Sequence, residues 1–274
     1  MARIEANGLT FEVSEEGAGT PVVLLHGFPD TSALWRHQVA ALTGAGFRTI
    51  APDMRGRGRS DRPPEVADYA LTKIVGDVTG IMDALGVQRA HVVGHDWGAV
   101  VAWLVAMLAP TRVDHLVAIS VGAPGAAGPP TLEALQKGWY RILFDMPGVA
   151  EELIQRNDWY LMRVLLEGSG ENFETYIANF SEPGALTAAL NWYRANTPVQ
   201  RLLGPGLPMP PVAAPTMGVF GTADVALTED AMVKSASKVS GPWRYERLEG
   251  IGHFIPLDAP DQLNKLLLDF LPRR

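Results

Sequence analysis

The sequence predicts an α/β protein, with a mostly parallel sheet, helices on both faces and a helical insertion. Two observations lead to this prediction. Short apolar runs of strand length alternate with longer segments whose apolar residues recur every three or four positions. This alternation stops between two stretches rich in glycine and proline, residues 121–130 and 204–215, and then resumes. Because 47% of the 274 residues are hydrophobic, the chain can bury a core and is not a disordered protein.

The elements before the insertion follow the alternation closely. Asn7-Gly8 favours a two-residue hairpin turn, so two antiparallel strands are expected around it. Residues 71–85 carry apolar side chains in steps of three and four and end before Gly86, which is typical of an amphipathic helix. The predicted strands of this part are residues 4–6, 9–13, 21–25, 47–51, 90–93 and 113–120, and the predicted helices are residues 71–85 and 97–109.

The insertion divides the predicted core into two parts. Between the two glycine- and proline-rich stretches the chain shows helical periodicity and many aromatic residues, but no clear strand. After the insertion we expect strands at residues 216–220 and 243–248, and helices at residues 228–239 and 259–271. The predicted segments are the first part of the core, residues 1–124, a helical cap (lid), residues 125–210, and the second part of the core, residues 211–274.

Composition and charge exclude several classes of protein. With 23 basic against 30 acidic residues the formal net charge is −7, which disfavours a nucleic-acid partner. The absence of cysteine excludes disulfides, thiolate metal sites and a cysteine nucleophile. No apolar run approaches the ~20 residues of a membrane span, and the N-terminus does not resemble a signal peptide. We therefore expect a cytoplasmic protein with no membrane partner, and we leave open whether it forms a homo-oligomer.

The segment Gly94-His95-Asp96-Trp97-Gly98 has the pattern Gly-x-nucleophile-x-Gly between a predicted strand and a predicted helix. Such a sharp turn needs its glycines because a side chain there would collide with the neighbouring helix or strand. The central residue is Asp96 rather than serine. An aspartate before a helix can also be a simple N-cap. We favour a nucleophile because of the partners that follow it in the chain.

A nucleophile on this type of turn is followed along the chain by an acid and then by a base. Of the six histidines, only His253 follows the last apolar strand, in a loop before the last helix. The strand before the insertion is followed by no carboxylate, whereas strand 216–220 is followed by Asp224. The sequence therefore predicts Asp96, Asp224 and His253 as nucleophile, acid and base.

The turn His26-Gly27-Phe28 follows one of the apolar strands, ahead of the predicted nucleophile. A lone His-Gly is often a plain turn. At this position, however, the backbone N–H groups of Phe28 and Trp97 are predicted to form an oxyanion hole.

Four motifs together resemble one enzyme family: His26-Gly-Phe-Pro29, Asp53-Met-Arg-Gly-Arg-Gly-Arg-Ser60, Gly94-His-Asp-Trp-Gly98 and Gly252-His-Phe254. They look like an α/β-hydrolase of the epoxide hydrolase and haloalkane dehalogenase branch, and the similarity runs over nearly the whole chain. In the insertion, residues 139–152 and 191–194 resemble the cap segments that carry the two lid tyrosines of soluble epoxide hydrolases. The resemblance places those tyrosines at Tyr140 and Tyr193.

The resemblance implies an epoxide hydrolase that forms a vicinal diol. Asp96 would open the epoxide and form an alkyl ester, which water activated by His253 would hydrolyse, with Asp224 orienting the imidazole. Tyr140 and Tyr193 would donate to the ring oxygen, because the departing alkoxide is strongly basic. The expected partners are a small apolar or aromatic epoxide and water. Since no motif for a metal, nucleotide or flavin appears, a reaction without a metal or cofactor is expected.

Two alternatives stay open at this point. A haloalkane dehalogenase uses the same aspartate nucleophile, and Trp97 would serve as one halide donor. One large group of these enzymes has asparagine as the second donor where this chain has Phe28. A small-molecule binding protein on the hydrolase fold is the non-enzyme alternative, which the full set of groups disfavours. Asp96 excludes a serine esterase, and Trp97 replaces the arginine that fluoroacetate dehalogenases carry after the nucleophile.

Overall fold

The computed structural model describes residues 1–166, 173–198 and 209–273. Within these residues, eight strands form one sheet in the order β1-β2-β4-β3-β5-β6-β7-β8. The strands are β1 (Ala2–Ala6), β2 (Leu9–Gly17), β3 (Thr20–Leu25), β4 (Phe47–Pro52), β5 (Ala90–His95), β6 (Val113–Ile119), β7 (Thr216–Gly221) and β8 (Trp243–Leu248).

The sheet is parallel except at one edge. Strands β3 to β8 pair in parallel, whereas β2 pairs antiparallel with both β1 and β4. Asn7 and Gly8 both have positive φ, as the predicted hairpin turn between β1 and β2 requires. The central strands β5 and β7 are buried throughout, which explains their continuous apolar runs. The predicted fold class is confirmed.

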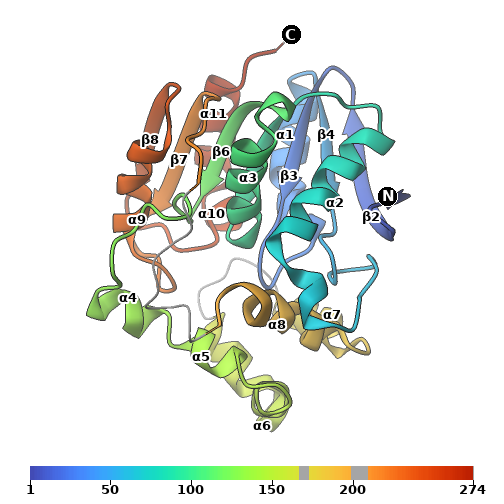
Figure 1. Ribbon diagram of the computed structural model, residues 1–274, viewed down its shortest axis with the longest axis vertical. Coiled ribbons are helices and arrows are strands. Elements are labelled where there is room, and N and C mark those ends of the chain that lie inside the picture. The colour runs from blue at the N-terminus through green and yellow to red at the C-terminus, as the bar shows by residue number, and fades with distance from the viewer. Residues whose placement is uncertain (167–172, 199–208, 274) are drawn as a thin grey trace.

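Helices cover both faces of the sheet (Figure 1). Helices α2 and α3 pack together on one face, and α1 and α11 pack together on the other. The helices are α1 (Arg36–Gly44), α2 (Leu71–Ala84), α3 (Trp97–Leu108), α4 (Leu132–Lys137), α5 (Tyr140–Phe144), α6 (Val149–Leu165), α7 (Phe173–Ser181), α8 (Ala185–Asn196), α9 (Glu229–Lys234), α10 (Ile255–Asp258) and α11 (Pro260–Phe270).

The helix predicted at residues 228–239 is shorter in the structure. Helix α9 ends at Lys234, and a 3-10 turn follows over Ser235–Lys238. The Ser235 hydroxyl donates to the Ala231 carbonyl at 2.7 Å and accepts the Ala123 N–H at 2.7 Å. This contact joins the end of α9 to the loop after β6. The tighter turn therefore carries a contact with a distant segment, which local periodicity does not reveal.

Helices α4 to α8 all lie in the connection between β6 and β7, and they gather beyond one end of the sheet (Figure 1). We call them the helical insertion. In α6, residues 156–159 leave the helical conformation, so this helix is broken near its middle. Residues 167–172 and 199–208, which belong to the predicted cap at 125–210, lie outside the described residues. The exact domain boundaries therefore stay a prediction.

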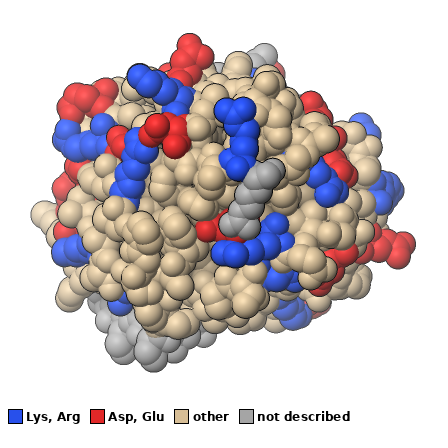
Figure 2. Space-filling view, turned by 90° about the horizontal axis from the view of Figure 1, so that it is seen from above, with Lys and Arg blue, Asp and Glu red and all other residues tan. Residues whose placement is uncertain are grey.

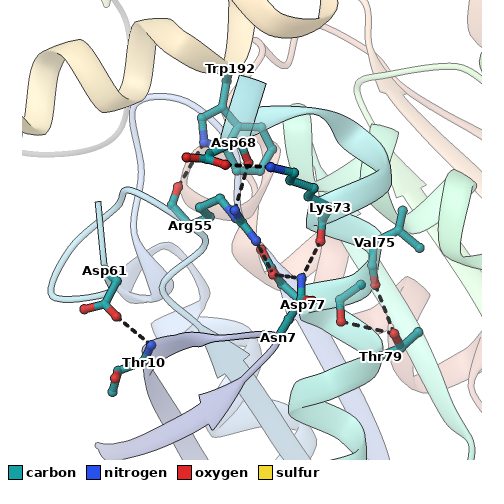
Figure 3. A network of polar contacts seen from close by, with 11 residues as sticks. Asn7, Thr10, Arg55, Asp61, Asp68, Lys73, Val75, Asp77, Thr79 and Trp192 are labelled. Carbon is teal, nitrogen blue, oxygen red and sulfur yellow. Dashed lines mark hydrogen bonds and ion pairs between the residues drawn. The ribbon is translucent and has the colours of Figure 1, made fainter. Parts of the chain in front are cut away.

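A buried polar network fixes helix α8 to the core (Figure 3). The Trp192 indole N–H on α8 donates to the Arg55 carbonyl at 3.0 Å. The Arg55 guanidinium donates twice to the Asp77 carboxylate on α2, at 2.7 and 2.6 Å, and Asn7 donates to the same carboxylate at 2.7 Å. Breaking a buried ion pair by removing one partner typically costs ~3–5 kcal/mol. Helix α8 is thus attached to a buried, ion-paired part of the core.

Surface charges are mixed in sign. On the face shown in Figure 2, basic and acidic residues are interspersed. Exposed pairs such as Arg244 with Asp269, at 2.6 Å, contribute little to stability because water screens them. No helix within the described parts of the chain combines the length and the apolar character needed to cross a membrane.

Candidate active site

Asp96 occupies a sharp turn between β5 and α3. It has φ 54° and ψ −122°, a conformation that few residues other than glycine adopt. The two flanking glycines are required by close packing. A Cβ at Gly94 would collide with the Gly98 carbonyl, and a Cβ at Gly98 would collide with the Leu25 carbonyl. The strand–turn–helix geometry expected from the sequence is therefore present, and it presents the Asp96 side chain at the end of the sheet nearest the insertion.

The structure brings the three predicted catalytic residues together. The His253 Nδ1 lies 2.8 Å from Asp224 Oδ2, and the His253 Nε2 lies 3.7 Å from Asp96 Oδ2. Asp224 follows β7 and His253 follows β8, whereas Asp96 follows β5. Because these strands are parallel, all three residues lie at the carboxyl end of the sheet. Asp224 and His253 are buried. One imidazole thus lies between two carboxylates.

The tight turn after β7 determines which oxygen of Asp224 faces the imidazole. The other oxygen, Oδ1, accepts the N–H groups of Ala226 at 2.8 Å and Leu227 at 2.9 Å. Burial alone would raise the pKa of Asp224, but the charge of His253 and these hydrogen bonds lower it below its ordinary value. Asp224 is therefore ionised at neutral pH.

The charges of the two carboxylates determine the protonation of His253. Burial alone would lower the pKa of His253, but Asp224 and Asp96 outweigh it and raise that pKa to about 10. Burial would likewise raise the pKa of Asp96, but the nearby charge of His253 and the hydrogen bond from the Phe28 N–H lower it below its ordinary value. At neutral pH the resting site therefore holds an imidazolium between two carboxylates.

The two oxygens of Asp96 have different surroundings. The Phe28 backbone N–H donates to Oδ1 at 2.7 Å, while Oδ2 faces His253. Gly27 permits this approach, because a Cβ there would collide with the Asp96 carboxylate. Oδ2 is therefore the oxygen oriented for attack, and Oδ1 already lies at an N–H donor. Trp97 begins α3 directly after Asp96, and its role as the second donor stays a prediction.

An apolar cavity of about 190 Å³ lies over Asp96 and His253. The insertion supplies most of its far wall. Among the described residues that line it, the basic side chains are Lys137 and His253. The lining residues are Phe28, Asp96, Lys137, Trp139, Tyr140, Phe144, Val164, Leu165, Leu166, Tyr193, Val225, Ala226, His253 and Phe254.

Tyr140 and Tyr193 line this cavity together, with ring centroids 6.0 Å apart. Tyr193 is fixed by edge contacts with Phe144 at 4.9 Å and Trp97 at 5.1 Å, and it lies on α8, the helix attached to the core. Burial, and then the charge of Asp96, raise the pKa of both phenols well above the ordinary value. Both phenols are therefore protonated at neutral pH and able to donate.

Comparison with known proteins agrees with this geometry. The family model described as the alpha/beta hydrolase fold matches residues 20–167. The chain belongs to the alpha/beta hydrolase fold family. This hydrolase is 33% identical to epoxide hydrolase A of Mycobacterium tuberculosis, over 98% of its own chain and 96% of that protein. It is 31% identical to human epoxide hydrolase 4, over 98% of its own chain and 77% of that protein.

Solved structures extend the likeness of this α/β hydrolase to its whole length. The crystal structure of epoxide hydrolase A from Mycobacterium thermoresistibile superposes with a TM-score of 0.85 at 29% identity, covering 100% of this chain and 98% of that one. An epoxide hydrolase from Vigna radiata superposes with a TM-score of 0.83 at 28% identity, covering 98% and 96%. The family predicted from the sequence motifs is therefore confirmed.

Two side chains of this hydrolase that sequence reasoning did not select hold the backbone of His253. The His95 Nε2 and the Ser120 hydroxyl each lie 2.9 Å from the His253 carbonyl oxygen. Ser120 has φ 69°, which directs it from the end of β6 toward this loop. The only available sequence signal was their position, next to the nucleophile and at the end of a central strand.

Buried neutral histidines predict that this hydrolase loses stability in acid. His26 accepts the Met54 N–H at 2.9 Å, and burial lowers the pKa values of His26 and His95 to about 4. Between pH ~6.5 and ~4 these two histidines become protonated in the unfolded chain but stay neutral in the folded protein. Each of them therefore lowers the free energy of unfolding by about 3 kcal/mol across this range. Asp30 opposes part of this loss, because burial raises its pKa to about 7. We expect a net fall in stability across this range.

Urea unfolding between pH 7 and pH 4 measures this effect. The His26→Asn variant is expected to be less stable at pH 7, but to lose about 3 kcal/mol less than the wild type on acidification. An equal loss in the two proteins would contradict the assignment of His26 as a buried neutral group.

Proposed function

We propose that this α/β hydrolase is an epoxide hydrolase that converts an apolar or aromatic epoxide into a vicinal diol. The observation that carries the proposal is the pair of protonated phenols, Tyr140 and Tyr193, in one apolar cavity with the Asp96 carboxylate. A phenol pair is suited to a leaving oxygen that needs a proton. The names of the relatives, epoxide hydrolases of similar length, support the same reaction.

In the first half-reaction Asp96 Oδ2 attacks a ring carbon of the epoxide. The bond between that carbon and the ring oxygen breaks, and its electron pair goes to the oxygen. Tyr140 and Tyr193 donate hydrogen bonds to this oxygen, and one phenol gives it a proton. The product is a hydroxyalkyl ester of Asp96, with the phenol proton to be replaced.

Neutralising Asp96 changes the protonation of the base. The pKa of His253 is high because two carboxylates face its ring. Esterification removes one of these charges, so the pKa of His253 falls and the imidazolium can release its proton. The proton that leaves the imidazolium replaces the one that the phenol gave to the ring oxygen, so this half-reaction balances without uptake from solvent.

In the second half-reaction neutral His253 removes a proton from water. The resulting hydroxide attacks the carbonyl carbon of the Asp96 ester, and negative charge develops on Oδ1, which lies at the Phe28 N–H. Asp224 stabilises the imidazolium that forms. The ester bond then breaks, and the proton of the added hydroxide passes to the departing alkoxide. The diol leaves, and the Asp96 carboxylate and the His253 imidazolium of the resting site are restored.

The haloalkane dehalogenase alternative lacks a side-chain donor at Phe28. This ring packs against Phe144 at 5.5 Å and Phe180 at 5.6 Å, so it offers no polar group to a halide. An assay of purified enzyme with a panel of aryl and alkyl epoxides and matched haloalkanes separates the two reactions. We expect diol from epoxides; halide release without any diol would overturn the proposal.

The His253→Ala variant is expected to form the alkyl ester but to hydrolyse it slowly. The first half-reaction does not require His253 to remove a proton from Asp96, and the Phe28 N–H, which also lowers the pKa of Asp96, remains in the variant. Intact-protein mass spectrometry after addition of epoxide should show the mass of one substrate, located in the peptide that contains Asp96. The matched control is His37→Ala, which removes an exposed histidine from α1 and should turn over normally. A saturated variant without any adduct would show that His253 is needed before alkylation.

The helical insertion is proposed to be the cap of this enzyme. Its helices supply Tyr140, Tyr193 and most of the cavity wall opposite Asp96. The cytoplasmic location expected from the sequence stays a prediction. The oligomeric state stays open.

A further inference from the structure

Lys137, at the end of α4, connects the insertion to the loop that carries Asp224. Its Nζ donates to the carbonyl oxygens of Asp224 at 2.9 Å and Leu227 at 3.1 Å. The Glu133 carboxylate, one turn earlier on α4, lies 3.1 Å from the same Nζ. An ammonium has three N–H donors. Two of these donors have carbonyl acceptors on the loop, and the Glu133 carboxylate pairs with the charge, so the ammonium group connects the loop to α4.

The two carbonyls lie at the two ends of one tight turn, residues 224–227. From the inside, Asp224 Oδ1 accepts the N–H groups of Ala226 and Leu227. From the outside, Lys137 holds the carbonyls of the first and last residues. Val225, between them, is 65% exposed, so apolar packing contributes little at the tip of the turn. The hydrogen bonds of Lys137 thus hold the outer side of this turn in place.

The position of this turn determines the alignment of the base. One carboxylate oxygen of Asp224 accepts hydrogen bonds within the turn, and the other lies 2.8 Å from His253 Nδ1. A shift of the turn therefore moves the acceptor that orients the imidazole. Rates are sensitive to such shifts, since a displacement of ~1 Å can cost ~10²-fold.

We propose that Lys137 is a positioning residue for hydrolysis of the ester. It holds the Asp224 turn so that Asp224 keeps His253 aligned toward the bound ester, and it does so from the insertion. The inference rests on the proposed function. The insertion then serves both half-reactions: its phenols assist the opening of the epoxide, and its lysine fixes the acid that the base depends on. Lys137 itself exchanges no proton and forms no bond with substrate.

The test compares Lys137→Met with the wild type, Lys137→Arg and Glu133→Gln. Methionine keeps the length and the stem of the side chain but removes the donors, whereas arginine keeps charged donors. Glu133→Gln removes only the charged partner on α4. In single-turnover experiments with an epoxide, we expect Lys137→Met to form the Asp96 ester at the wild-type rate. It should then hydrolyse that ester about tenfold to a hundredfold more slowly. Lys137→Arg should recover most of the loss, and Glu133→Gln should behave as the wild type.

A second measurement does not depend on the substrate. It follows the proton NMR signal of the His253 Nδ1–H, which is hydrogen-bonded to Asp224 and therefore appears in the downfield region of the spectrum of the folded protein. We expect this signal to shift or broaden in Lys137→Met and to be restored in Lys137→Arg. An unchanged signal together with unchanged ester hydrolysis would overturn the role of Lys137. Equal slowing of both half-reactions would also overturn it, because that pattern indicates general damage to the insertion. Wild-type protein that forms no ester with any epoxide would contradict the proposed function instead, and the NMR comparison would still decide the position of the turn.

Discussion

Replacing Asp96 with alanine is expected to abolish turnover, lowering kcat by at least ~10⁴-fold. The nucleophile and the base act as a unit, so the loss of either one is enough to stop the reaction. Asp96 is the carboxylate on the turn and lines the cavity, and its Oδ2 is the oxygen that faces His253. Water activated by His253 has no ester to attack if no ester can form. The variant should therefore accumulate no covalent adduct, in contrast to His253→Ala.

The fold is expected to survive this change. Aspartate and alanine both carry a Cβ, so the backbone strain at φ 54° is already present in the wild type, and the change removes a carboxylate that burial disfavours. The measurements are diol formation, intact mass after exposure to epoxide, and unfolding by urea. The control is Asp230→Ala, which removes an exposed carboxylate from α9 and should retain activity. A folded Asp96→Ala protein that still produces diol would eliminate the nucleophile assignment.

Removing both lid hydroxyls is expected to have the next largest effect. A positioned proton donor typically contributes ~10²–10⁴-fold, and its contribution is greatest where charge develops in the transition state. Since Tyr140 and Tyr193 line the same cavity with rings 6.0 Å apart, each can partly replace the other. Single Tyr→Phe variants should slow alkylation moderately. The double variant should nearly abolish it, while the ring contacts with Phe144 and Trp97 remain.

Burst-phase measurement of alkylation with an epoxide provides the test. Tyr160→Phe is a suitable control, because Tyr160 lies on α6 with 63% of its surface exposed. A dehalogenase would show no such dependence, since a halide leaves as a stable anion and needs no phenolic proton. If the double variant alkylates at the wild-type rate, the argument specific to epoxides fails, and only the fold and the arrangement of Asp96, His253 and Asp224 remain.

Sequence reasoning predicted the core well because its signals are local. The central strands are buried on both faces, so each is a continuous apolar run, and glycines mark the turn at Asp96 because a Cβ does not fit there. The order of nucleophile, acid and base along the chain was enough to select Asp224 and His253. The structure brings these side chains within hydrogen-bonding or charge-contact distance of one another.

The contacts that sequence reasoning missed join segments far apart in the chain. Lys137 reaches the Asp224 turn across 87 positions, and Tyr176 donates to Asp30 across 146 positions at 3.0 Å. A lysine at the end of a short helix looks like an ordinary surface charge, because periodicity describes one helix and not its placement. The early end of α9 likewise coincides with a contact between Ser235 and the loop after β6.

The attachment of α8 to the core separates the chemistry from the choice of substrate. Tyr193 lies on the helix that Trp192 joins to Arg55, so its hydroxyl keeps its place when other parts of the insertion vary. Val164 and Leu165 also line the cavity, but they lie on α6, away from that attachment. Mutations on α6 can therefore reshape the cavity while Tyr193 on α8 and Asp96, Asp224 and His253 in the core keep their places. This division gives evolution, natural or in the laboratory, a wall on which new substrate ranges and enantiomer preferences can be selected without rebuilding the catalyst.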